Sequence, residues 1–166
     1  CGQMLIYPVC DNERGKYESM EKYKDAVWSK NSNEQMWRSY LSRGVEKETY
    51  TIPMKNELHD LPPAYIEPQQ FDTLRDEAIV YANKLKNAGV DVDLNVISGS
   101  YHGFDADLKS PLVKRVFEKR FDQCGSLSAY DDGKGQGCHS RRAFDCWRRG
   151  NELILALYKN NKFVEK

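Results

Sequence analysis

The sequence predicts an α/β fold in which helices flank a parallel sheet, and three observations support this prediction. Residues 4–9 form a continuous apolar run, which is typical of a strand buried on both faces of a parallel sheet. Residues 64–97 have the pattern of strand, helix and strand with short connections, a βαβ unit with a right-handed crossover. A further helix pattern begins at Ser110-Pro111, with proline in the first turn.

The region between the first strand and the βαβ unit is polar, with large apolar side chains at spaced positions. In residues 17–50 this pattern predicts one or two helices that lie outside the sheet. The stretch Ser32-Asn33-Glu34-Gln35 has the spacing of a capping box, and Gly44 is a typical helix end.

The βαβ unit has clear internal boundaries. Residues 64–67 form a short strand, after which Asp72 or Thr73 caps an amphipathic helix that ends at Gly89. Side chains in residues 90–97 alternate between apolar and polar, which predicts the second strand.

The last part of the chain differs in composition. Residues 123–140 contain four glycines and are expected to form a linker, and residues 141–166 are expected to form an amphipathic tail of unknown role. We expect the edge of strand 4–9 to be apolar and unpaired, because this chain supplies later strands on one side only. The tail either covers part of that surface or is a loosely attached helix.

The overall composition excludes some classes of function. The 166 residues carry 25 basic and 25 acidic side chains, so there is no basic excess for nucleic acid or anionic membranes. No apolar run approaches the ~18 residues of a membrane span. The chain starts at Cys1 without an initiator methionine, so we expect it to be cut from something longer; a lipoprotein attachment cysteine is the alternative.

The cysteines argue against both disulfides and metal. Their number, five, is odd and their spacing is wide, which favours a reducing, cytoplasmic compartment over a disulfide framework. Four residues in the last part of the chain could nominally bind zinc but lack the close cysteine pair of zinc sites. They are Cys124, Cys138, His139 and Cys146. We therefore expect free thiols and neither metal nor cofactor.

Two loops that follow the strands of the βαβ unit carry the candidate chemistry. Asp72 follows strand 64–67, and His102 follows strand 90–97. Because the carboxyl ends of parallel strands meet at one edge of a sheet, we expect the two side chains to approach within hydrogen-bonding distance. An aspartate followed by a histidine in consecutive loops is the order that a Ser-His-Asp hydrolase of this fold requires.

Six short motifs in the same order add a family resemblance. They are Leu5-Ile6-Tyr7-Pro8-Val9, Met36-Trp37-x-x-Tyr40-Leu41, Leu61-Pro62-Pro63-Ala64, Phe71-Asp72-x-Leu74-Arg75-Asp76-Glu77, Tyr81-Ala82-x-x-Leu85-x-x-Ala88-Gly89-Val90 and His102-Gly103-Phe104. Over residues 1–121 the chain resembles the C-terminal part of an α/β-hydrolase of the hormone-sensitive-lipase-like family of esterases and lipases. The resemblance implies that Asp72 is the triad acid, that His102 is the base and that residues 17–50 form a cap-like insertion over the acyl pocket.

The chain departs from the family pattern where the nucleophile should be. It contains no Gly-x-Ser-x-Gly, and its only His-Gly pair is His102-Gly103, so the oxyanion-hole motif is absent too. We expect residues 1–122 to be the C-terminal half of a hydrolase domain, inactive alone, from a carboxylic ester hydrolase acting on small-molecule esters. Its partner at the exposed sheet edge is the missing N-terminal half or another chain. A non-catalytic remnant or interaction module and a serine peptidase of the same fold are the alternatives.

Several candidate residues have a second interpretation. Asp72 could be only a helix cap, with Asp76 as the substitute acid. Asp76 and Glu77 are expected to be first-turn acids that the helix dipole favours. His59 is expected to be an exposed loop residue, and Ser100 a turn residue rather than an alternative nucleophile. Four large side chains either pack in the core or face the substrate: Trp28, Met36, Trp37 and Tyr40.

Overall fold

The computed structural model describes residues 2–13, 15–42 and 51–128. The chain packs as two units, Gly2–Ala106 and Asp107–Lys166, the latter with Cys1. Each unit is described by itself. The first contains the sheet, the helix of the βαβ unit and both loops that carry candidate site residues.

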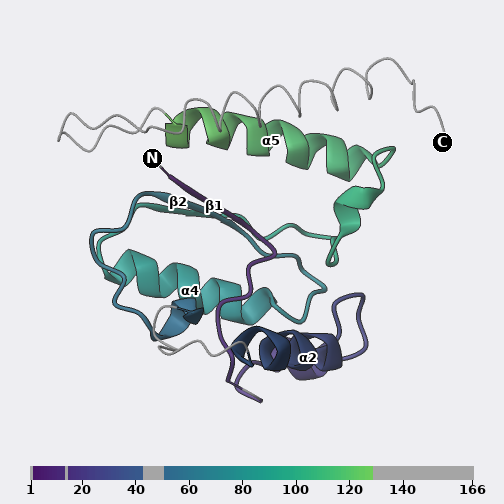
Figure 1. The fold of residues 1–166 in the computed structure, drawn as a ribbon. Helices are drawn as coiled ribbons and strands as arrows, with labels where there is room; N and C mark the ends of the chain where they lie inside the picture. Colours follow the sequence, from purple (N-terminus) through teal and green to yellow (C-terminus); the bar gives the residue numbers. More distant parts are fainter. Residues whose placement is uncertain (1, 14, 43–50, 129–166) are drawn as a thin grey trace. The chain divides into compact units, whose positions relative to one another are not determined.

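The first unit contains a three-stranded parallel sheet (Figure 1). Its strands are β1 (Gln3–Ile6), β2 (Ala64–Glu67) and β3 (Val92–Leu94), in the order β1-β2-β3. Leu5 pairs with Ile66, and Ile66 pairs with Leu94. The predicted α/β fold with a parallel sheet is therefore confirmed.

Helix α4 (Arg75–Asn87) connects β2 to β3 and lies along one face of the strands (Figure 1). Its buried residues are spaced so that they share one side of the helix: Ala78, Tyr81, Ala82 and Leu85. They pack against Ala64 and Ile66 of β2 and Val92 of β3. The helix ends at Asn87, just before the predicted stop signal Gly89, whose φ of 84° is the left-handed conformation that glycine adopts at little cost.

Within the described part of residues 17–50, helices precede the βαβ unit as predicted. They are α1 (Glu18–Lys22) and α2 (Lys30–Leu41), and a short 3-10 turn, η1 (Pro53–Lys55), follows them. The predicted cap at Ser32 was wrong, because the Ser29 hydroxyl accepts the Ser32 amide at 3.0 Å and starts α2 earlier. Gly44, the predicted helix end, lies outside the described residues.

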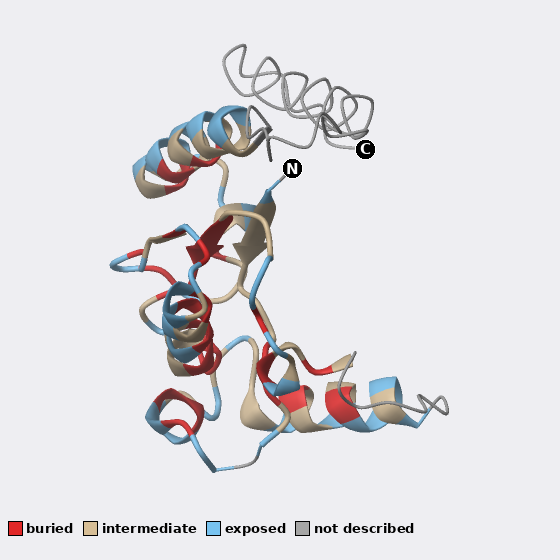
Figure 2. Cartoon of the chain, turned by 90° about the vertical axis from the view of Figure 1, so that its left-hand side faces the viewer, coloured by how far each residue is buried: buried red, intermediate tan, exposed pale blue. Residues whose placement is uncertain are grey.

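The first strand is shorter and more exposed than predicted. The strand predicted over residues 4–9 ends at Ile6, because Tyr7 takes a left-handed φ of 50° and Pro8 has no backbone N–H for a sheet. Figure 2 shows β1 at intermediate exposure and β2 as buried. Within this chain β1 is therefore less buried than its apolar pattern indicates, which agrees with the expectation that its edge is unpaired. Among the described residues β2 is the only strand that pairs with β1, as the edge prediction requires.

The second strand of the unit is also shorter than its sequence pattern. Alternation over residues 90–97 gives a ladder only over Val92–Leu94, followed by one bridge between Gln69 and Ile97. Val96 is exposed although its position in the pattern is apolar. The neighbouring strand β2 ends at Glu67, so a longer β3 would have no continuous partner.

Helix α5 (Pro111–Ser128) begins where the proline signal places it, in the second unit. The predicted start of the linker at residue 123 was wrong, since α5 continues through residues 123–128. Gly125 lies inside the helix, where a single glycine costs only about 1 kcal/mol relative to alanine. The rest of the predicted linker and the tail, residues 129–166, lie outside the described residues. No helix within the described ranges is long and apolar enough to span a membrane.

Candidate active site

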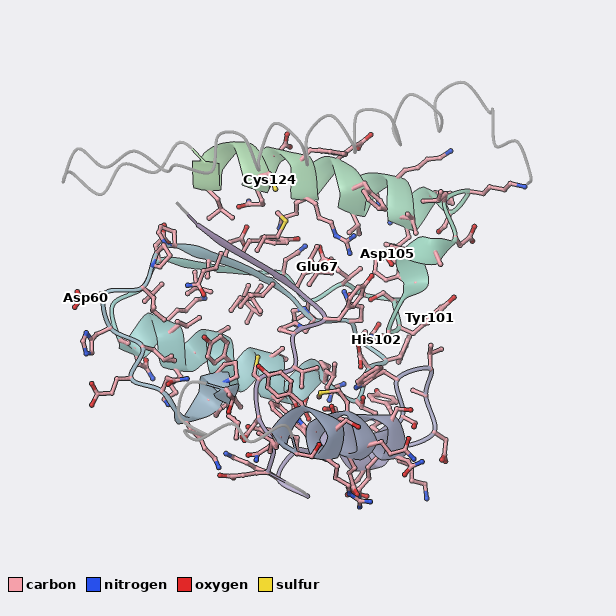
Figure 3. All side chains as sticks on the ribbon, in the orientation of Figure 1. Asp60, Glu67, Tyr101, His102, Asp105 and Cys124 are labelled. Atoms are coloured by element: carbon pink, nitrogen blue, oxygen red, sulfur yellow. The ribbon has the colours of Figure 1, made fainter. Side chains whose placement is uncertain are left out.

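Asp72 and His102 meet beyond the carboxyl ends of β2 and β3. The Nδ1 atom of His102 lies 2.8 Å from Oδ2 of Asp72, and the carboxylate is buried. Figure 3 shows His102 on the loop at that end of the strands, next to the exposed Tyr101. The predicted approach of the two side chains is therefore confirmed, and the parallel arrangement of β2 and β3 is its cause.

The Asp72 carboxylate contacts three groups, one at Oδ2 and two at Oδ1. Oδ2 contacts His102, whereas Oδ1 accepts the backbone N–H of Leu74 at 3.0 Å and lies 3.3 Å from the hydroxyl oxygen of Thr73. This turn leads directly into α4, whose first turn also includes a 3.3 Å bond from the Arg75 amide to the Asp72 carbonyl. The prediction that Asp72 or Thr73 caps α4 was wrong, because the N-cap residue is Leu74 and no side chain caps it. Asp72 instead closes the turn before the helix and contacts His102. The local turn fixes the direction in which Oδ2 points.

The loop that carries His102 is held by a second buried turn. Ser100 is fully buried, its hydroxyl donates to the Ile97 carbonyl at 2.6 Å, and its carbonyl accepts the Phe71 amide. These bonds support the predicted turn role for Ser100, because a hydroxyl committed to a backbone carbonyl is not presented to a substrate. Gly99 and Gly103 flank the site with φ values of 76° and 75°, which a larger residue would adopt only with strain.

Aromatic rings contact the imidazole of His102 from two directions. The Trp28 indole is stacked on it, with ring centroids 5.2 Å apart and an angle of 22° between the planes. The Tyr7 ring lies at 4.9 Å with an angle of 42°, and it contacts Phe104 as well. Sequence patterns left Trp28 open between packing and substrate contact, and the structure places it against the histidine.

The segment that contains α1 is fastened to the loop that carries Asp72. The amide of Ser19 donates to Asp76 Oδ2 at 2.8 Å, and the amide of Asp76 donates back to Ser19 Oγ at 3.1 Å. The Ser19 hydroxyl also donates to the Thr73 carbonyl, and the Thr73 hydroxyl donates to the Trp28 carbonyl, both at 2.8 Å. Because Ser19 and Thr73 are buried, these bonds are shielded from water and fix the loop from one side.

Asp76 is occupied by these structural contacts and by Arg75. Burial pushes the pKa of Asp76 upward, but hydrogen bonds from Arg75 and Ser19 outweigh it and hold the pKa below its usual value. The Arg75 guanidinium contacts Asp76 Oδ1 at 2.7 Å. Asp76 therefore stays charged in a structural pair, and His102 is bonded to Asp72 instead.

Glu77 is a buried residue whose surroundings the sequence did not reveal. Its Oε1 accepts the backbone N–H groups of Cys10 at 2.7 Å and Asp11 at 3.3 Å, from the chain that follows β1. Burial raises the pKa of Glu77 to about 8; repulsion from Asp11 and Asp72 raises it as well, and the two amides oppose the shift. The prediction that Glu77 lies in the first turn of the helix is confirmed. Glu77 does more than interact with the helix dipole, because it also connects α4 to the chain that follows β1.

The other candidates lie elsewhere. His59 is exposed, as predicted, and hydrogen bonds to Asp60 and Glu57 raise its pKa above the usual value. Tyr40 is also exposed, whereas Trp37 packs in the core, with Met36 partly buried beside it.

The expected absence of a metal site concerns residues that are mostly outside the described ranges. Cys124 lies in α5, and Cys138, His139 and Cys146 are not among the described residues. Within the described part of the chain no group of three or more histidine, cysteine, aspartate or glutamate side chains could hold a metal ion.

The chain is similar in sequence and fold to known proteins. A family model of the alpha/beta hydrolase fold matches residues 1–106. Lipase 2 of Moraxella sp. (strain TA144) is 31% identical over 105 residues, which are 61% of this chain and 24% of the lipase. Arylacetamide deacetylase of Mus musculus is 31% identical over 86 residues, 50% of this chain and 22% of the deacetylase.

Solved structures agree with the sequence matches. A bacterial heroin esterase superposes with a TM-score of 0.66 at 29% identity, over 73% of this chain and 40% of the esterase. A thermostable esterase from Pseudomonas putida gives a TM-score of 0.65 at 28% identity, over 71% of this chain and 39% of the esterase. The chain thus spans less than half of each of these relatives. It belongs to the α/β-hydrolase fold family, in the hormone-sensitive-lipase-like group of esterases and lipases.

Proposed function

We propose that this chain supplies the acid and the base of a Ser-His-Asp carboxylic ester hydrolase, with Asp72 as the acid and His102 as the base. The observation that supports the proposal best is the 2.8 Å contact between His102 Nδ1 and the buried Asp72 carboxylate. The lipase and esterase names of its relatives favour ester substrates over peptides. Small-molecule esters are accordingly the proposed substrate class.

The proposal gives each of the two side chains a task. Asp72 accepts the Nδ1–H of His102, which selects the tautomer whose Nε2 carries a free lone pair. That Nε2 takes the proton from a serine hydroxyl as the serine attacks the ester carbonyl, and it later returns the proton to the leaving alcohol. The buried carboxylate stabilises the imidazolium that exists between these two steps.

The nucleophile and the oxyanion hole must come from outside these 166 residues. The chain contains no Gly-x-Ser-x-Gly, and we propose that it has no esterase activity alone. Residues 17–50 are proposed to form a cap-like insertion, since α1 and Trp28 lie against the loop of Asp72 and the ring of His102. The same absence of a nucleophile motif favours one second candidate, an interaction module that kept the half-fold without catalysis.

Expression of the chain together with the coding sequence that precedes Cys1 tests the proposal. The product should hydrolyse short-chain aryl esters, and Asp72→Asn should lower kcat by up to about 10⁴-fold because it imposes the wrong histidine tautomer. His59→Ala, an exposed histidine with carboxylate neighbours, is the matched control and should leave the rate unchanged. Three results would refute the enzymatic proposal. They are a stop codon directly before the codon for Cys1, a preceding coding sequence without Gly-x-Ser-x-Gly, and full activity of Asp72→Asn.

The same proposal extends to the partner and the location of the complete protein. Its partner at the edge of β1 would be the segment that carries the nucleophile, either in the same polypeptide or in another chain. A cytoplasmic location is proposed from the odd number of widely spaced cysteines.

A further inference from the structure

The stacked indole of Trp28 is a feature that the proposed acid and base do not explain. Trp28 belongs to the segment between α1 and α2, far along the chain from His102, and it could have packed against any apolar surface. Its ring instead lies nearly parallel to the imidazole, 5.2 Å between centroids. A contact with a group that must change its charge during the reaction deserves a chemical explanation.

We propose that Trp28 is a positioning residue for His102, an inference that rests on the proposed function. Its indole covers one face of the imidazole and holds the ring in the plane in which Nδ1 meets Asp72. Because Nδ1 and Nε2 belong to the same rigid, planar ring, that plane also sets where Nε2 points.

A single hydrogen bond would not fix the imidazole. The 2.8 Å contact with Asp72 still permits the ring to tilt about the line that joins the two atoms. Trp28 blocks this tilt on one face, and Tyr7, at 4.9 Å and 42°, restricts it from another direction. The left-handed φ of 50° at Tyr7 is uncommon for a bulky residue and places a second ring at the histidine.

Trp28 is itself held at both ends, so it can act as a support. Its carbonyl accepts the buried Thr73 hydroxyl at 2.8 Å, next to Asp72 in the chain. Its indole N–H donates to Oδ1 of Asn33, a buried residue of α2, at 3.2 Å. The backbone of Trp28 is therefore anchored to the loop that carries Asp72, and its indole is anchored to α2.

The stack also suits the charged state of the base. Aromatic faces attract cations, and the imidazolium is present only after His102 has taken the serine proton. A leucine at position 28 would fill only part of this space and would offer no such face.

The test uses the full chain and follows the His102 Nδ1–H proton by NMR with ¹⁵N-labelled histidine. This proton lies in the bond to Asp72, and its exchange with water reports how firmly the ring is held. We expect Trp28→Leu to speed exchange about two- to tenfold, the factor that matches the usual strength of an aromatic contact. Trp28→Phe should restore slow exchange, because it keeps the aromatic face. Val27→Ala, at a neighbouring side chain that is 71% exposed, is the matched control and should change nothing.

A further variant covers the case in which Trp28→Leu does not fold. Asn33→Leu removes the acceptor of the indole N–H while Trp28 stays in place, and it should speed exchange in the same direction. Unchanged exchange in a folded Trp28→Leu chain, or in Asn33→Leu if the former unfolds, would overturn the inference and leave the proposed function standing. If the unmodified chain shows no such proton, or if Asp72→Asn leaves it unaltered, the pairing itself fails and the proposed function falls with it.

Discussion

Replacing Glu77 by glutamine should remove most of the loss of stability that ionisation of this buried side chain causes as pH rises. Glu77 is 1% exposed, and its Oε1 accepts the amides of Cys10 and Asp11. Glutamine has nearly the same shape and keeps a carbonyl oxygen for these two amides, but it carries no charge. The substitution therefore separates the ionisation of the side chain from its hydrogen bonds.

The size of the effect follows from the pKa of Glu77. Burial first, and then the nearby carboxylates of Asp11 and Asp72, raise this pKa from 4.5 to about 8. Folded chains therefore keep a proton that unfolded chains have already lost, so this contribution to stability is complete below pH 4.5 and disappears as pH rises through 8. Each unit of pKa difference between the folded and unfolded chains corresponds to about 1.4 kcal/mol, so ionisation of Glu77 lowers the free energy of unfolding by on the order of 5 kcal/mol.

Chemical unfolding of both proteins between pH 5 and pH 9 measures this difference. The two should have similar stabilities at pH 5, where Glu77 is neutral in the folded chain, and Glu77→Gln should be the more stable protein at pH 9. Glu118→Gln, at an exposed position of α5, is the control and should follow the unmodified chain throughout. Parallel pH profiles for Glu77→Gln and the unmodified chain would show that burial does not hold this proton, and the reasoning would be wrong.

Three further predictions concern the site and its supports. Asp72→Asn should abolish the slowly exchanging Nδ1 proton of His102 in NMR spectra, because an amide does not hold that tautomer; its persistence would argue against the pair. The 166-residue chain should show no turnover of a short-chain aryl ester, and turnover that disappears in His102→Ala would contradict this. Ser19→Ala should lower the free energy of unfolding in urea by about 1–3 kcal/mol, since the buried hydroxyl bonds two backbone groups, whereas the exposed Ser42→Ala should not.

The Asp72–His102 pair could be predicted from the sequence because it depends on local signals and one rule of topology. Short strands at 64–67 and near 90–97 follow from residue patterns, and a helix between them makes the strands parallel. The carboxyl ends of parallel neighbours then lie at the same edge, whatever the remaining chain does. No knowledge of distant contacts was needed.

The environment of Glu77 could not be predicted in this way. In the sequence it is an acid in the first turn of a helix, where the helix dipole alone is a sufficient explanation. Its burial depends on the chain after β1, which turns at Tyr7 and brings the amides of Cys10 and Asp11 over the helix. The same turn ended β1 early, and no pattern in residues 4–9 indicates a left-handed tyrosine.

The surroundings of His102 depend on contacts between segments that are distant in sequence. Ser19 and Thr73 each bond the partner segment through one buried hydroxyl, and such residues carry no sequence signal for a remote partner. Trp28 reaches the imidazole only because those bonds hold its segment against the acid loop. A chain could therefore keep the motifs of Asp72 and His102 and still lose the orientation of the base through changes in residues 17–28. The motifs identify which residues could take part in catalysis. The contacts of the α1 segment decide whether the imidazole is held in a position where it can act as the base.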